Sequence, residues 1–180
     1  MNHFAVTAVG ADRPGIVAAV TGVFAEHGCN LEDSSMTILR GQFAMMLVVA
    51  APTGVDATDL EAARAAPAAA LGLVVTVRPT TEPPAPADGP EATSWTVSVY
   101  GADHPGIVHG VASLLAGAAV NIVDLTTRVT GTAADPVYAM VLDVTFPAGT
   151  DPRDLERRLG AAADTLGVTC RLHPSAADIL

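Results

Sequence analysis

The chain has 180 residues, of which 50% are hydrophobic and 16% are charged, a composition typical of a globular protein and not of a disordered one. Its nine basic residues are all arginine and are outnumbered by 19 acidic residues, which gives a formal net charge of −10. This charge argues against direct binding to nucleic acid, because that affinity depends on cationic side chains at phosphates. No apolar run reaches the roughly 18 residues of a membrane span and no secretory signal is visible, so we expect a cytoplasmic protein.

An internal repeat organises the sequence. Residues 6–17 recur as residues 97–108 with eight of 12 positions identical, at an offset of 91. The match continues through the second half of each copy at an offset of 95, because four residues are inserted near 132–136. A proline-rich segment typical of a linker lies between the copies. The sequence therefore predicts a first domain, a linker and a second domain at residues 1–79, 80–93 and 94–175.

The hydrophobic periodicity of the first copy predicts a strand, a helix and a hairpin in chain order. A mostly apolar strand at 4–9 is followed by a helix that has Pro14 in its first turn and stops at Gly28. The next two strands, at 30–39 and 43–50, are close enough to form a hairpin.

A second helix and a final strand complete each copy. In the first copy the helix starts near Asp56, and we expect it to break or kink at Pro67, because proline removes a helical hydrogen bond. The second copy has the same pattern, with its second helix starting near Pro152. This βαββαβ order predicts the α+β class: two tandem ferredoxin-like domains, each a four-stranded antiparallel sheet with two helices on one face. The final strands are expected at 73–77 and 168–172.

The sequence contains no pattern typical of catalysis or of metal binding. It has no Ser-His-Asp or Cys-His set, and the histidines have the spacing of surface or capping residues. An acylphosphatase-like phosphate cradle would use an arginine such as Arg13, but the second copy has His104 there. Cys29 and Cys170 lack a CxxC spacing, and we expect two free, buried thiols. We therefore expect no enzyme activity, no metal and no cofactor.

The motif that remains lies around the first helix of each copy. A strand is followed by Asp-x-Pro-Gly-Ile-Val at the helix start, and an asparagine with a hydrophobic residue then begins the next strand. This motif resembles the ACT domain, a regulatory amino-acid-binding module. A tandem pair without an attached enzyme resembles the glycine-cleavage-system transcriptional repressor group. The resemblance covers residues 3–78 and 94–173.

The resemblance implies a site for a free amino acid in each copy. The ligand carboxylate would accept hydrogen bonds from backbone N–H groups at the helix start, at Gly15 and Ile16 in the first copy. The ammonium would donate to side-chain oxygens of Asn30 and Asp12. The predicted ligand-binding residues of the two copies are Asp12, Arg13, Pro14, Gly15, Ile16, Asn30, Leu31, Asp103, His104, Pro105, Gly106, Ile107, Asn121 and Ile122.

A purely structural interpretation of the same residues stays open. Asp12 and Asp103 can cap the helix, the prolines can start it and the asparagines can form a turn. If Arg13 and His104 instead lie near a bound carboxylate, the His104 site should tighten as the pH falls through about 6.5.

The leading hypothesis is a non-enzymatic amino-acid sensor, with glycine or serine as the first ligands to test because of the resemblance. It would signal to a protein partner such as a transcription regulator, without direct contact with nucleic acid or a membrane. Family members bind ligand between paired modules, which here belong either to one chain or to a homodimer. The alternatives are an interaction module without a ligand and a regulatory subunit of an amino-acid biosynthetic enzyme.

Overall fold

The computed structural model describes three stretches of the chain: residues 1–80, 93–132 and 135–175. The chain divides into two compact units, Met1–Pro84 and Ala85–Leu180. Nearly all of the expected linker at 80–93 lies outside the described residues, since only Thr80 and Thr93 belong to described strands. No helix within the described stretches is long and apolar enough to span a membrane.

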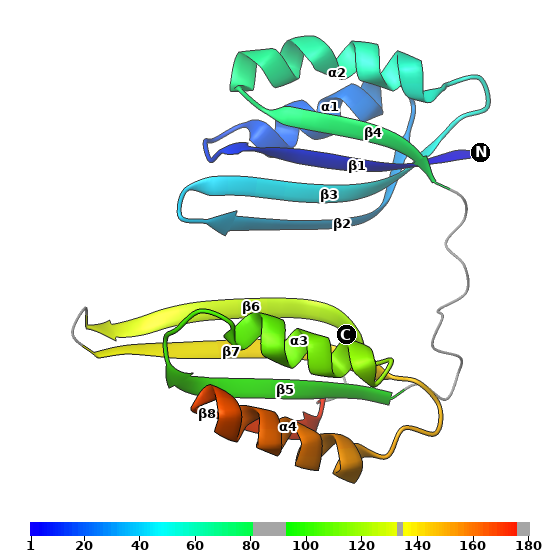
Figure 1. The fold of residues 1–180 in the computed structure, drawn as a ribbon. Helices are drawn as coiled ribbons and strands as arrows, with labels where there is room; N and C mark the ends of the chain where they lie inside the picture. The colour runs from blue at the N-terminus through cyan, green and yellow to red at the C-terminus, as the bar shows by residue number, and fades with distance from the viewer. Residues whose placement is uncertain (81–92, 133–134, 176–180) are drawn as a thin grey trace. The chain divides into compact units, whose positions relative to one another are not determined.

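The first unit is a four-stranded antiparallel sheet in the order β2-β3-β1-β4, with both helices on one face (Figure 1). The predicted fold class is confirmed. Strand β1 is longer than the apolar run at 4–9, because it pairs along its whole length with β3. The elements are β1 (Asn2–Ala11), α1 (Ile16–Glu26), β2 (Asn30–Leu39), β3 (Gln42–Ala51), α2 (Ala57–Leu71) and β4 (Val74–Thr80).

The second unit repeats this topology with the strand order β6-β7-β5-β8. Its hairpin strands have 12 residues each, where those of the first unit have 10. The predicted insertion near 132–136 therefore lengthens the hairpin, although residues 133 and 134 lie outside the described part of the chain. The elements are β5 (Thr93–Ala102), α3 (Ile107–Gly117), β6 (Asn121–Thr132), β7 (Asp135–Phe146), α4 (Pro152–Leu166) and β8 (Val168–Pro174).

Each unit has its own hydrophobic core between the sheet and the two helices. Alternate residues of a strand point to one face of a sheet, so Phe4, Val6 and Ala8 of β1 are buried, and β3 alternates in the same way from Phe43 to Val49. Of the apolar residues at helical spacing in α1, Ile16, Val20, Val23 and Phe24 are buried, whereas Val17 is 41% exposed. Full burial of a side chain such as Phe24 or Leu115 contributes roughly 1.5–3 kcal/mol.

The N-terminus of the first helix differs from two predictions. The N-cap residue of α1 is Gly15, with φ 93°, and the N-cap of α3 is Gly106, with φ 101°. Neither helix has a side-chain cap, so the interpretation of Asp12 and Asp103 as caps is wrong: each lies three residues before the cap position. The prolines precede the glycines and so lie outside the first turn.

Helix α1 stops just before Gly28, as predicted, and Gly28 has φ 68°. The N–H of Gly28 donates to the Ala25 carbonyl at 3.0 Å, and that of Cys29 donates to the Phe24 carbonyl at 2.9 Å. This pair of bonds is the Schellman motif, which places its C′ residue in the left-handed region that favours glycine. The second unit makes the same bonds with Ala119 in that position, at φ 57°.

The second helices begin where the sequence predicted. Asp56 forms a capping box with Asp59, and the Asp151 side chain accepts a hydrogen bond from the N–H of Arg153. The expected break at Pro67 is absent, because α2 runs without interruption through this residue. Capping at Asp56 and burial of Leu60 hold α2 before the lost hydrogen bond, and burial of Ala68 and the bonds at its C-cap, Gly72, hold it afterwards.

Candidate functional site

The loops between β1 and α1 and between β5 and α3 contain the predicted ligand-binding motif. In both loops a glycine with a left-handed backbone begins the helix, and the space above its Cα is open: a Cβ built on Gly15 or Gly106 meets no atom within 4 Å. These glycines are therefore required by their φ angle and not by crowding. A ligand has room to approach the backbone at this point.

The backbone N–H groups at the start of the helix are unpaired in the part of the chain that the structure describes. The first bond of α1 runs from the N–H of Ala19 to the Gly15 carbonyl at 2.9 Å, and Gly110 bonds to Gly106 in the same way at 2.8 Å. Within the described residues, the N–H groups of Gly15 and Ile16 have no backbone or side-chain acceptor. The start of a helix also carries a partial positive charge, so this site suits a carboxylate.

Two contacts hold the first loop in place. The N–H of Asp12 donates to the carbonyl of Gly41 at the hairpin turn, at 2.8 Å. The Arg13 guanidinium donates through Nη2 to the carbonyl of Leu71, the last residue of α2, at 2.6 Å. The loop is thereby joined to both the hairpin and the second helix.

His104 makes the equivalent contact in the second unit. Its Nε2 lies 2.6 Å from the carbonyl oxygen of Leu166, the last residue of α4, and its Nδ1 lies 3.0 Å from that of Pro105. The last carbonyls of a helix lack helical partners, and a cation there is favoured by the dipole. Sequence reasoning placed Arg13 and His104 beside a ligand and missed this contact, for which a single sequence carries no signal.

The asparagines that begin β2 and β6 lie far from these loops. Asn30 is level with Ala50 in β3, and Ala50 is level with His3 near the start of β1. The loop follows Ala11, and the eight steps from His3 to Ala11 span about 26 Å at roughly 3.3 Å per residue. One unit alone therefore does not bring Asn30 to the loop, and of the two ammonium acceptors predicted for the first copy only Asp12 lies in the loop itself.

The edge strands β2 and β6 carry exposed apolar side chains. Met36 and Ile38 on β2 are about half exposed, although their register places them on the helix-covered side of the sheet. On β6, Val123, Leu125 and Val129 are exposed as well. An edge strand presents unpaired backbone groups to another chain, and apolar side chains along it favour such pairing. Sequence reasoning missed this surface, because the pattern within a strand does not show which strand lies at the edge of a sheet.

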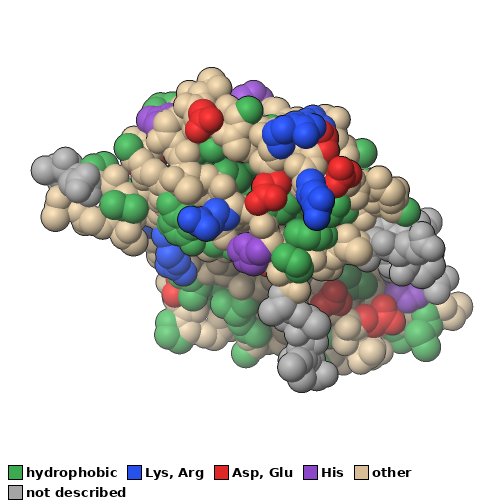
Figure 2. Space-filling model, turned by 90° about the horizontal axis from the view of Figure 1, so that it is seen from below, with side chains coloured by type: hydrophobic (Ala, Val, Ile, Leu, Met, Phe, Trp, Pro, Cys, Tyr) green, Lys and Arg blue, Asp and Glu red, His purple; other side chains and the backbone are tan. Residues whose placement is uncertain are grey.

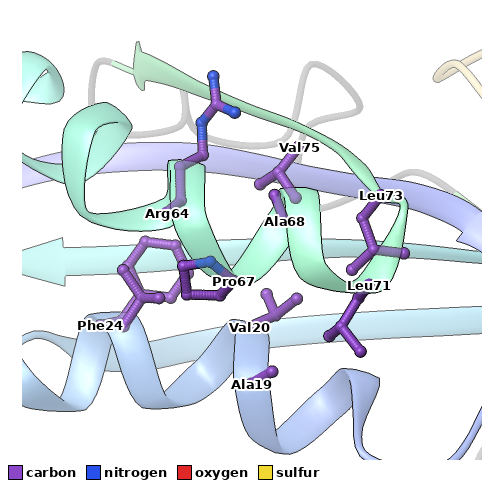
Figure 3. A pocket seen from close by; sticks show the side chains of 10 residues that line it. Ala19, Val20, Phe24, Arg64, Pro67, Ala68, Leu71, Leu73 and Val75 are labelled. Atoms are coloured by element: carbon purple, nitrogen blue, oxygen red, sulfur yellow. The ribbon is translucent and has the colours of Figure 1, made fainter.

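A small pocket between α1 and α2 is not suited to an amino acid (Figure 3). Figure 3 shows Pro67 and Ala68 of α2 facing Val20 and Phe24 of α1. The space that they enclose measures about 10 Å³, room for roughly one water molecule. The Arg64 side chain also lines this pocket, and its Nε is buried without a hydrogen-bond partner.

The cysteines and acidic residues form no further site within the described residues. No group of three or more His, Cys, Asp or Glu side chains lies close enough to hold a metal ion in that part of the chain. Both thiols are free and only partly buried, less than the sequence predicted. Burial raises the pKa of the Cys170 thiol to about 11, so this side chain stays protonated at neutral pH.

Comparisons with known proteins identify the class of protein. The ACT-domain family model matches residues 2–78, and the second unit repeats the same motif and topology. A UPF0237 protein of Methanosarcina mazei is 37% identical over 78 residues, which are 43% of this chain and 85% of the relative. The chain belongs to the ACT-domain family and contains two such domains in tandem.

The similarity to one group of regulatory proteins extends over most of the chain. The glycine cleavage system transcriptional repressor of Escherichia coli is 28% identical over 167 residues, which are 92% of this chain and 86% of the repressor. A crystal structure of an unknown protein from Galdieria sulphuraria is 28% identical, with a TM-score of 0.80 over 97% of this chain and 99% of that one. The protein is an ACT-domain regulatory protein related to the glycine cleavage system repressor.

Proposed function

We propose that this protein is a non-enzymatic sensor that binds a free amino acid and transmits its presence to a protein partner. The observation that carries the proposal is the pair of open loops, where a glycine with positive φ leaves N–H groups of the helix start unpaired beside free space. A carboxylate satisfies such groups and interacts favourably with the helix dipole.

The contact between the ligand ammonium and an asparagine requires a second module. Asn30 and Asn121 lie at the opposite end of the sheet from the loop of their own unit, so each must complete a site with the loop of another module. The exposed apolar side chains on β2 and β6 support association of modules through these edges. The second module belongs either to the same chain or to a second copy of it.

The partner and the ligand are proposed from charge and from the relative's name. Acidic and basic side chains are interspersed on the face shown in Figure 2, and the net charge is −10, so we propose a protein partner in the cytoplasm and no direct contact with DNA. The E. coli relative is named for repression of the glycine cleavage system. Glycine and serine are therefore the first ligands to test, and a transcription regulator is the first partner.

A thermal-shift screen of the 20 common amino acids tests the ligand. A ligand that binds only the folded state adds about 2.7 kcal/mol at a hundredfold excess over Kd, or roughly 5–10 °C in Tm. Asn30→Ala and Asn121→Ala should each weaken binding at one site by about 10-fold or more, since a hydrogen bond to a charged group is lost. Asn30→Asp and Asn121→Asp, which keep a side-chain oxygen, should retain binding.

The screen also separates the sensor from the second candidate function, an interaction module without a ligand, which the exposed apolar edge strands favour. If no amino acid raises the Tm of the wild type, the sensor proposal fails and the interaction module replaces it. If one does but all four asparagine variants respond like the wild type, the ammonium is held elsewhere. Recovery of a metabolic enzyme in a pull-down would instead indicate a regulatory subunit.

A further inference from the structure

His104 contacts two backbone carbonyl oxygens at once. Its Nε2 lies 2.6 Å from the oxygen of Leu166 at the end of α4, and its Nδ1 lies 3.0 Å from the oxygen of Pro105 in its own loop. The contact with Leu166 joins residues 62 positions apart in the sequence. It connects the loop that opens α3 with the C-terminus of α4.

A neutral imidazole satisfies only one of these two contacts. It has one N–H donor and one lone pair, and a carbonyl oxygen only accepts. In the neutral state one ring nitrogen therefore directs a lone pair at an oxygen, which is repulsive, whereas an imidazolium donates to both. The Leu166 carbonyl also lies at the negative end of the helix dipole, where a cation is favoured.

The charged groups around His104 agree with this assignment. The two backbone hydrogen bonds and then the carboxylate of Asp103 raise the pKa of His104, and partial desolvation opposes them. On β7 the titratable group that interacts with Asp103 is Tyr138, whose hydroxyl donates to the sulfur of Met140 and whose pKa is raised by burial and then by the Asp103 carboxylate. From α4 the group that contacts the ring is an uncharged carbonyl. Asp164 is the acidic residue of the last turn, and the arginines of α4, at 153, 157 and 158, lie in its first half.

We propose that His104 is a positioning residue: its protonated ring donates to both carbonyls and so fastens the loop before α3 to the end of α4, whereas the neutral ring keeps only one of the two hydrogen bonds. Loss of one bond loosens the loop of Pro105 and Gly106, which carries the open N–H groups of the second site. That site is thus well ordered for a carboxylate at mildly acidic pH and loosened as the pH rises. The consequence for ligand binding rests on the proposed function, whereas the fastening itself does not.

The first unit is a built-in control for this proposal. Arg13 occupies the equivalent position and donates to the Leu71 carbonyl at the end of α2 at 2.6 Å. A guanidinium stays charged throughout the physiological range, so this contact does not depend on pH. The two loops of one chain therefore differ in pH response although they share the same motif.

NMR on the full chain, without any ligand, tests whether protonated His104 holds its loop against the end of α4. We expect the His104 imidazole to titrate with a midpoint above 6.5, and the ¹³C signal of the Leu166 carbonyl to shift with the same midpoint. His104→Arg should remove the Leu166 titration and keep the carbonyl signal at its low-pH position. Arg13→His should create a new titration at the Leu71 carbonyl. A His104 midpoint at or below 6.5, or a Leu166 signal that does not follow it, would overturn the proposal.

The consequence for binding is tested separately with the amino acid found in the thermal-shift screen. The measurement uses a chain whose first site carries a substitution that weakened binding in the screen. In this chain the Kd should rise several-fold between pH 6 and pH 8 when residue 104 is histidine, and it should stay constant in His104→Arg. His104→Gln, which cannot be protonated, should have the weaker affinity at both pH values. Equal pH dependence of Kd in all three proteins would contradict the coupling. If no amino acid binds at all, the proposed function fails while the NMR result still decides the fastening.

Discussion

The two units have the same topology and each has a core of its own, yet three of the equivalent positions at which they differ have visible structural consequences. Arg64 in α2 corresponds to Leu159 in α4, and Gly28 after α1 corresponds to Ala119 after α3. At the loop, Arg13 corresponds to His104. Each unit thus has a less favourable residue at one position where the other has a better one: the first unit between its helices and the second unit after its first helix.

The fold therefore tolerates a less favourable residue at one position when the rest of the unit's core is intact. Leu159 is buried between α3 and α4, whereas Arg64 leaves a buried Nε without a partner beside a pocket of about 10 Å³. Ala119 has φ 57°, in a region that L-residues avoid, although its Schellman bonds are the same as those of Gly28. Exchanges between equivalent positions therefore test what each difference contributes.

The largest effect is expected from Leu159→Arg, which places the residue of the first unit in the second. Leu159 is 2% exposed, so the variant loses a buried apolar contact and must fit a longer, charged side chain there, with Glu156 at the position that Glu61 holds beside Arg64. Loss of the buried leucine and crowding by the longer side chain should lower the free energy of unfolding of the second unit by about 2–5 kcal/mol. Urea unfolding followed by fluorescence of Trp95, the single tryptophan, which lies in β5, measures this unit. The reverse exchange, Arg64→Leu, should stabilise the first unit, and an unchanged midpoint for Leu159→Arg would show that α4 can turn this side chain outward.

Pro67→Ala should stabilise the first unit, by less than Leu159→Arg destabilises the second. The second unit has Ala162 at the equivalent position. Proline inside a helix is about 3 kcal/mol less favourable than alanine, and part of this difference is offset because proline also restricts the unfolded chain. We expect a net gain of about 2 kcal/mol, measured as slower amide hydrogen exchange in α2. Faster exchange would instead show that packing of the proline ring against Phe24 outweighs the lost hydrogen bond.

The exchange at the Schellman position should change stability by about 1 kcal/mol in opposite directions. Ala119→Gly relieves a left-handed alanine and should raise the urea midpoint reported by Trp95, whereas Gly28→Ala should lower the stability of the first unit. A Cβ at Gly28 meets Pro52 only at an ordinary 3.6 Å, so strain and not collision causes the loss. Ala118→Gly, at φ −101°, is the matched control and should destabilise slightly. A gain from the control equal to that of Ala119→Gly would contradict the assignment to φ.

The smallest expected effect is the change in the stability of the second unit with pH. The pKa of His104 is raised in the folded protein, so its stabilising contribution is complete below the unfolded value of about 6.5 and is lost as the pH rises through the folded pKa. The urea midpoint reported by Trp95 should therefore fall relative to that of His104→Arg between pH 6 and pH 8. Parallel midpoints of the two proteins over this range would show that the ring contributes nothing to stability.

Much of the fold was predictable from local patterns. The repeat, the order of the six elements and the buried stripe of α1 follow from periodicity and from glycine and proline signals, which act over a few residues. The prediction failed where a local rule met tertiary packing. α2 runs without interruption through Pro67, where we expected a break or kink, and no local pattern indicated that Met36 and Ile38 would be exposed on an edge strand. Whether a strand lies at the edge of a sheet depends on pairing with distant segments and not on its own residues.

The candidate site shows the same division. The sequence by itself determined the motif, its duplication and the family that it indicates, because these depend only on the identity and spacing of residues. Only the tertiary structure decided that Gly15 and Gly106 cap their helices and that Arg13 reaches Leu71, 58 residues away. It also placed Asn30 at the far end of the sheet from its own loop. The physical reason is that the chain turns back after each strand and each helix. The distance between two residues is therefore set by the register of the sheet and not by their separation in sequence.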